Sequence, residues 1–180
     1  MKSIKQLSDI LPIRYDDKIL RLLSFHDIEW YSNNLRRDYY ERYMDFKFSK
    51  DIAKERLEQI LYQIAIDGLC GTASNHEARL VLCNEESIIG GITIMEKDDA
   101  SIELGYFIIP EQSSKGLASK MLSVFIDKLR ESKVDFKIIR LIIREDNAAS
   151  IKVAEKLGFK LSNEVLGKYK RNLIYTLVRD

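Results

Sequence analysis

The residues of this chain that could do chemistry lie first in 101–119, which read S-I-E-L-G-Y-F-I-I-P-E-Q-S-S-K-G-L-A-S. The pattern predicts a strand over 102–109, a short turn at Pro110, and a helix over 115–131. Gly116 and its small neighbours would let an anion approach the backbone amides. The free N–H groups and the dipole of a first helical turn favour negative charge. The stretch therefore indicates a phosphate site, although ordinary helix-capping residues would explain the same pattern.

A second candidate piece is the helix start at Asn147, in N-A-A-S-I-K-V-A-E-K-L-G-F. Asn147 is a natural N-cap, Ser150 falls in the first turn, and Gly158 closes the helix. A capped amphipathic helix explains each of these residues without any function.

Glu103 is the candidate general base, because Glu is disfavoured in strands and this one stands in an apolar run. Alternation places Glu103, Gly105, Phe107 and Ile109 on one face of the strand, where Gly105 leaves room beside the carboxylate. Partial burial would suit this carboxylate to accept a proton, directly or through water. A solvated charge near a strand start explains it as well.

The elements that must position these residues form one mixed pattern. A strand–helix–strand unit over 102–109, 115–131 and 136–144 predicts parallel neighbours with a right-handed crossover. The paired Gly90 and Gly91 inside a strand suggest a bulge or a close backbone approach. We expect an α/β chain of the α+β type, with a mixed sheet of about seven strands and about four helices. The other strands are predicted at 19–23, 78–83, 87–95, 160–166 and 169–178, and the other helices at 28–34, around 53–64 and at 147–157.

Together the two pieces resemble the GNAT superfamily of acetyltransferases, and within it the RimJ/RimL-type N-acetyltransferases. The likeness rests on I-E-L-G-Y-F-I-I-P, on the P-x-x-x-x-K-G-x-A-x turn and on N-x-x-S-x-x-x-A-E-K-L-G-F, and it covers about residues 19–178. In this family a Q/R-x-x-G-x-G/A loop binds the CoA pyrophosphate, and residues 113–118 occupy its position. Ser113 stands where Gln or Arg is usual. The resemblance implies a splayed central sheet.

The resemblance also implies a set of site residues. Many family members protonate the departing thiolate with a Tyr, but that position holds Ala154, so Ser150 becomes the candidate. An acidic residue is common at the position of Glu103. The catalytic candidates are thus Glu103 and Ser150, acetyl-CoA is the expected co-substrate, and no metal is expected. The residues expected to bind the cofactor are Phe107, Ile108, Ile109, Ser113, Ser114, Lys115, Gly116, Leu117, Ala118, Ser119, Asn147 and Ser150.

Composition limits the possible partners. The chain has 180 residues, with 29 Lys plus Arg against 28 Asp plus Glu, so no strong field favours nucleic acid or an anionic membrane. Two cysteines indicate reduced thiols in a cytoplasmic protein. We expect one domain over 1–180, with 1–18 as an N-terminal extension and the core at about 19–178. A monomer or a homodimer is expected.

The expected activity is transfer of an acetyl group from acetyl-CoA to a primary amine, by direct attack in a ternary complex. An α-amine, with a pKa of about 7.7–8, is neutral far more often at pH 7 than a lysine amine of about 10.4. This mildly favours a protein N-terminus, although small-molecule amines stay open. In this family the first helices and their loop wall the acceptor pocket, where some of the aromatic residues between 30 and 48 could contact substrate. Two alternatives are a non-catalytic acyl-CoA-binding module and a purely structural interaction domain.

Overall fold

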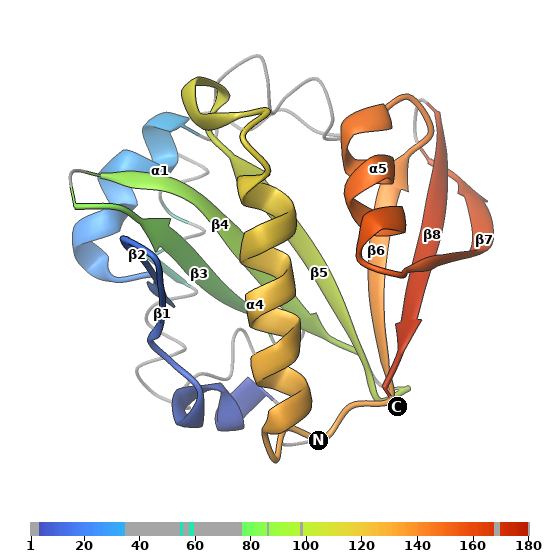
Figure 1. The fold of residues 1–180 in the computed structure, drawn as a ribbon, viewed down its shortest axis with the longest axis horizontal. Helices are drawn as coiled ribbons and strands as arrows, with labels where there is room; N and C mark the ends of the chain where they lie inside the picture. The colour runs from blue at the N-terminus through green and yellow to red at the C-terminus, as the bar shows by residue number, and fades with distance from the viewer. Residues whose placement is uncertain are drawn as a thin grey trace.

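The computed structural model describes residues 4–34, 55, 58–59, 77–85, 87–97, 99–167 and 170–179 (Figure 1). The predicted helix around 53–64 and the aromatic residues between 39 and 48 lie outside the described part, apart from single positions.

One mixed sheet organises the described residues. It has eight strands in the order β1-β2-β3-β4-β5-β6-β8-β7, one more than expected. The additional strand, β1, pairs Ile13 with Leu20 of β2. Leu7 and Ile13 are buried in the core, so part of the expected N-terminal extension packs with the sheet. The strands are β1 (Ile13–Tyr15), β2 (Lys18–Leu22), β3 (Glu77–Cys83), β4 (Ile88–Glu96), β5 (Ser101–Ile108), β6 (Ile138–Arg144), β7 (Lys160–Leu166) and β8 (Arg171–Val178).

Helices cover one face of the sheet over β4 to β6. The helix α4 (Leu117–Glu131) crosses in front of the sheet and α5 (Ala148–Lys156) lies in front of β6 (Figure 1). The helix α4 has one apolar stripe, since Met121, Leu122, Phe125 and Leu129 are all buried. A helix with one apolar stripe must bury it against another element. This packing fixes where α4 begins, above the end of β5.

On the opposite face the described residues form a smaller buried cluster. The helix α1 (Ile28–Asn34) has the predicted bounds. Its Ile28 is buried with Val81 and Ile88, and Trp30 and Phe107 pack against this cluster. Neighbours of Val81 and Phe107 along their strands, such as Leu80 and Ile108, belong to the main core on the α4 side. Alternate residues of β3 and β5 therefore face opposite sides of the sheet, as strand geometry requires. Among the described helices, none is long and apolar enough to cross a membrane.

The glycine pair in β4 marks a close backbone approach, and the register between β3 and β4 also shifts at Leu82 and Cys83. Both predicted features are therefore present. A Cβ atom on Gly91 would lie 2.5 Å from the carbonyl oxygen of Leu80, and one on Gly90 would lie 2.6 Å from that of Phe107.

β5 and β6 are parallel, as the crossover predicted, but they pair over only part of their length. The register joins Ser101 with Ile138, Ile102 with Ile139, and Glu103 with Arg140. Beyond Glu103 the two strands separate. The sheet therefore opens at Leu104 on one side and at Leu141 on the other.

Candidate active site

The gap between β5 and β6 holds a cavity of about 490 Å³. Its walls include Leu104 to Ile108 of β5, Leu141 to Arg144 of β6, the turn before α4, and the start of α5. Residues from both faces line it: Leu104 and Ile108 belong to the α4 side, whereas Phe107 packs with the cluster of α1. The cavity therefore passes through the sheet at the point where the strands separate.

The turn before α4 forms a cradle of backbone amides at this cavity. Ser114 and Gly116 both adopt left-handed backbone conformations, with φ of 62° and 75°. A helix that begins at Leu117 leaves the first amides without an intrahelical partner. Gly116 contributes no side chain, and a Cβ there would meet no atom of the described residues within 4 Å. Six of the predicted residues line the cavity here, namely Ser113, Ser114, Gly116, Leu117, Ala118 and Ser119.

The backbone of β5 supplies a second set of polar groups. The amide of Ile109 donates to the carbonyl oxygen of Ile89 at 3.0 Å, and its own carbonyl accepts from the amide of Gln112 at 3.0 Å. Ile109 is thus bonded within the protein, which corrects its predicted place at the cofactor. Because amides alternate sides along a strand, Phe107 also directs its backbone to β4. The backbone groups of Tyr106 and Ile108 then face the gap.

The start of α5 forms the opposite wall. Asn147 is the N-cap, as predicted, and its Oδ1 accepts the amide of Ser150 at 3.2 Å. Asn147 and Ser150 both line the cavity. The hydroxyl of Tyr106 lies 3.5 Å from the carbonyl oxygen of Ser150. The Tyr106 side chain therefore reaches from β5 to α5 across the gap.

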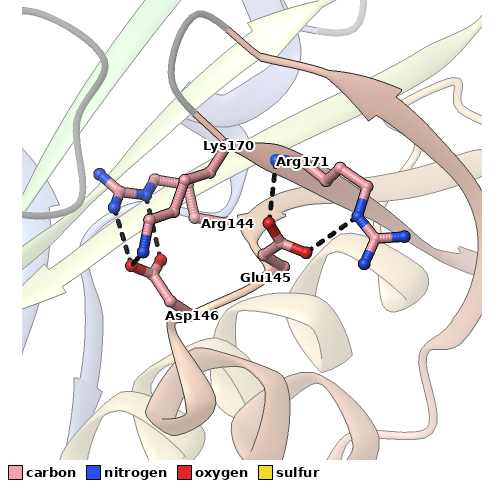
Figure 2. A network of polar contacts seen from close by, with 5 residues as sticks. All are labelled: Arg144, Glu145, Asp146, Lys170 and Arg171. Atoms are coloured by element: carbon pink, nitrogen blue, oxygen red, sulfur yellow. Dashed lines mark hydrogen bonds and ion pairs between the residues drawn. The ribbon is translucent and has the colours of Figure 1, made fainter.

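Ion pairs fix the turn between β6 and α5. Arg144 donates to both carboxylate oxygens of Asp146, at 3.1 and 2.8 Å, and Lys170 contacts the same carboxylate at 2.6 Å (Figure 2). Hydrogen bonds from Lys170 and Arg144 lower the pKa of Asp146 to about 2. Arg171 pairs beside them with Glu145 at 2.9 Å (Figure 2). The turn that presents Asn147 is thus tied to Lys170 and to Arg171, the first residue of β8.

A family model described as an acetyltransferase (GNAT) domain matches residues 18–160. This chain belongs to the GNAT acetyltransferase family. The resemblance noted in the sequence is confirmed, and with it the expectation of an acetyltransferase. A search of curated proteins finds no significant match.

Solved structures share this GNAT fold at low sequence identity. The ribosomal-protein-S5-alanine acetyltransferase from Vibrio fischeri is 20% identical, with 94% of this chain and 97% of that chain covered and a TM-score of 0.75. An acetyl transferase from Salmonella typhimurium that modifies the N-terminal serine of L7/L12 is 14% identical, with coverage of 92% and 97% and a TM-score of 0.76. Spermidine N-acetyltransferase from Vibrio cholerae, in complex with CoA and spermine, is 19% identical, with coverage of 91% and 96% and a TM-score of 0.72. The first two agree with the expected RimJ/RimL likeness.

Besides Ile109, two further predicted site residues lie apart from the cavity lining of this GNAT domain. Lys115 is exposed, and its ammonium donates to Oε1 of Gln112 at 2.9 Å. Glu103 stands on β5 just before the strands separate, and its Oε2 lies 3.2 Å from Nζ of Lys97. Its side chain is only 16% exposed, so the carboxylate is partly buried.

The lining residues that sequence reasoning missed include Arg79, Thr93, Gly105 as a wall residue, and Tyr106. The first three come from β3, β4 and β5, and only the strand register brings them together. Tyr106 carried a usable signal, because an aromatic residue on the α4 face of a strand beside the crossover must lie near both helices. Within the described part of the chain, no group of three or more His, Cys, Asp or Glu side chains could hold a metal ion.

Proposed function

We propose that this GNAT domain transfers the acetyl group of acetyl-CoA to a primary amine by direct attack, with both substrates bound together. The observation that carries the proposal is the cavity between β5 and β6, which passes through the sheet. A cavity reached from both faces allows the two substrates to approach from opposite sides. Holding two reactants in line can supply much of the rate gain of such a reaction.

The residues present fit an acyl-CoA molecule. The amides of residues 114–119 would hold the pyrophosphate, since several N–H groups point out of a helix start whose dipole favours anions. The backbone groups of Tyr106 and Ile108 would pair with the pantetheine arm as an added strand does. Asn147 and Ser150 would close the other side. When bound, acetyl-CoA supplies an activated acyl group.

The chain's own groups would then manage the protons and the developing charge. The carboxylate of Glu103 would take the proton of the acceptor amine, directly or through water. As the new C–N bond forms and the C–S bond breaks, an amide of β5 would steady the carbonyl oxygen. The hydroxyl of Ser150 would donate to the departing thiolate. Tyr106 lies beside it and is a second candidate for this step, because a phenol can also donate a proton.

The acceptor is proposed as a primary amine. Structural neighbours are named for a ribosomal protein alanine, for spermidine and for an aminoglycoside, so the fold accommodates several kinds of amine. The lower pKa of an α-amine, about 7.7–8, makes it the acceptor that needs least help from a partly buried carboxylate.

Calorimetry with CoA and a thiol-release assay over peptides, polyamines and aminoglycosides test the proposal. We expect CoA binding and thiol release with at least one amine. Binding without release would favour the non-catalytic module, and no binding would favour the structural domain. A Glu103→Gln variant should lower kcat/KM most at the acid end of a profile from about pH 6 to 9, where the amine is protonated. An unchanged profile would remove Glu103 from the mechanism.

A further inference from the structure

A row of three residues crosses the sheet from β3 to the cavity. The register pairs Arg79 with Thr93 and Thr93 with Gly105. Residues directly opposite one another in antiparallel strands lie on the same face of the sheet. All three line the cavity, so the row leads from the gap between β5 and β6 to a guanidinium two strands away.

Arg79 is held in place at the end of this row. It forms an ion pair with Glu77, and its Nη1 lies 3.4 Å from the Oγ1 of Thr93. The Glu77 side chain is 4% exposed and that of Arg79 is 13% exposed. Removing two charges from water carries a large cost, which a well-packed apolar pair would avoid. A fixed and largely desolvated guanidinium is also the arrangement that binds carboxylates well.

Gly105 keeps the row open toward the gap. Among the described residues, a Cβ atom at Gly105 would meet only Thr93, at 3.7 Å. That contact is ordinary, so packing of the described residues would accept a larger residue there. The missing side chain instead leaves room above Thr93, between the gap and Arg79.

The charges around the cavity point to the same kind of ligand. Among the described residues that line it, the charged ones are Arg79 and Arg144, and none is acidic. Arg144 shares Asp146 with Lys170. Glu103 lies on the same face in the adjacent row, where the register joins it through Met95 to Glu77. The Glu77 side chain is 4% exposed and absent from the cavity lining, so an amine near Glu103 would have Arg79 as the charged lining residue beside its remaining atoms.

We propose that Arg79 is a specificity-determining residue that binds a carboxylate carried by the acceptor amine. The inference rests on the proposed acetyl transfer and names its acceptor class. The carboxylate belongs either to a small amino acid-like compound or to an acidic first residue of a peptide. Polyamines are poor acceptors under this proposal, because their further ammonium groups would meet Arg79.

Matched acceptors test the proposal on the wild-type chain. Alanine is compared with alaninamide, and a tripeptide amide beginning with aspartate is compared with the same peptide beginning with asparagine. Thiol release from acetyl-CoA gives kcat/KM for each, with spermidine as a further acceptor. We expect the carboxylate member of one pair to be favoured about 10- to 100-fold. The pair that shows the preference identifies the source of the carboxylate, and equal rates within both pairs overturn the proposal.

Variants then assign the preference to Arg79. Arg79→Gln should remove it while the Kd for CoA stays unchanged, and Arg79→Lys should retain only part of it because the planar fork is lost. Arg140→Gln is the matched control, since Arg140 lies on the same face but pairs with Asp99 and is absent from the cavity lining. It should keep the full preference. A preference that survives in Arg79→Gln overturns the proposal.

Two further measurements separate the possible failures. Arg79→Gln leaves the buried Glu77 without its charged partner. If this single variant does not fold, the double variant Glu77→Gln with Arg79→Gln is used in its place. If no amine releases thiol, the proposed acetyl transfer fails. Titration of N-acetylalanine and of the N-acetylated aspartyl peptide in the presence of CoA then decides the carboxylate site: loss of binding in the Arg79 variant supports it. Equal affinities, or binding of neither ligand, overturn it.

Discussion

Two glycine positions on neighbouring strands should respond in opposite ways to the same added methyl group. Gly91 and Gly105 both lie on the face of the sheet that is turned away from α4. A Cβ on Gly91 would lie 2.5 Å from the carbonyl oxygen of Leu80 and 2.9 Å from the ring of Phe107. At Gly105 its nearest neighbour would be Thr93, at 3.7 Å. The first position has no space for a methyl group, whereas the second has space that the proposed acceptor would use.

The magnitudes follow from these distances. Relief of the contact at Gly91 requires β3 or β4 to move, because the nearest atom belongs to the backbone. Overpacking of this kind typically costs about 1–3 kcal/mol, which for a domain of this size lowers Tm by roughly 2–4 °C per kcal/mol. Gly105→Ala instead lowers the conformational entropy of the unfolded chain, so the free energy of unfolding should rise by up to about 0.5–1 kcal/mol.

The assay combines thermal unfolding, CoA titration and thiol release on both variants. Gly91→Ala should unfold at a lower temperature than wild type. Gly105→Ala should unfold at the same temperature or higher and bind CoA with unchanged Kd, while KM for the acceptor rises. Equal losses of stability in the two variants would refute the packing argument. A stable Gly105→Ala with an unchanged acceptor KM would refute the assignment of this space to the acceptor.

Three other substitutions test the cradle, the turn and the leaving group. Ser114→Gly removes a serine in the left-handed conformation, so the free energy of unfolding should rise by up to about 1 kcal/mol. The affinity for CoA should be unchanged, because backbone amides of the cradle bind the pyrophosphate. Ala100→Gly, at a similar φ of 60°, is the control for stability. In Asp146→Asn the exposed ion pairs are lost, at a cost of at most about 1 kcal/mol. Because the pKa of Asp146 is lowered from 3.8 to about 2, the difference from wild type in urea unfolding should be constant above about pH 5. It should disappear as the pH falls toward 2, and a difference that grows instead would contradict the assignment. Ser150→Ala removes the hydroxyl proposed to protonate the thiolate, so kcat should fall about tenfold or more. The Asn147 cap uses the Ser150 amide and is kept, so the Kd for CoA should be unchanged. An unchanged kcat would exclude the hydroxyl from this step.

Local sequence patterns predicted most helices and strands, and the differences are found at element ends and in short strands. The helix over 28–34 has the expected bounds. The crossover helix α4 begins at Leu117 rather than at 115, because Gly116 takes a left-handed conformation that ends the preceding turn. The strand β1 was missed because its three residues are too few to show alternation.

The site residues fall into two groups, those placed by their neighbours in sequence and those placed by strand pairing. The amide cradle and the Asn147 cap depend on neighbours in sequence, so the chain itself indicated both. The row from Arg79 through Thr93 to Gly105 depends on strand register, because a slip of one residue in any of the three strands would move that strand's member of the row to the other face. The place of Ile109 depends on its pairing with Ile89, which the apolar run I-I-P does not reveal.

The shape of the cavity bears on the order of events. The cradle before α4 and the cap of α5 lie toward one face, and the row ending at Arg79 lies on the other. Each set of groups can therefore be occupied while the other is filled. The two sets meet at Gly105 and Ile142, where β5 and β6 have separated. A reacting amine and an acyl group held from opposite faces at this point need no covalent carrier between them. The geometry thus favours a ternary complex. The strands β5 and β6 are paired only as far as Glu103, so the gap beyond it leaves room to hold both reactants in line, and such positioning can supply much of the rate gain.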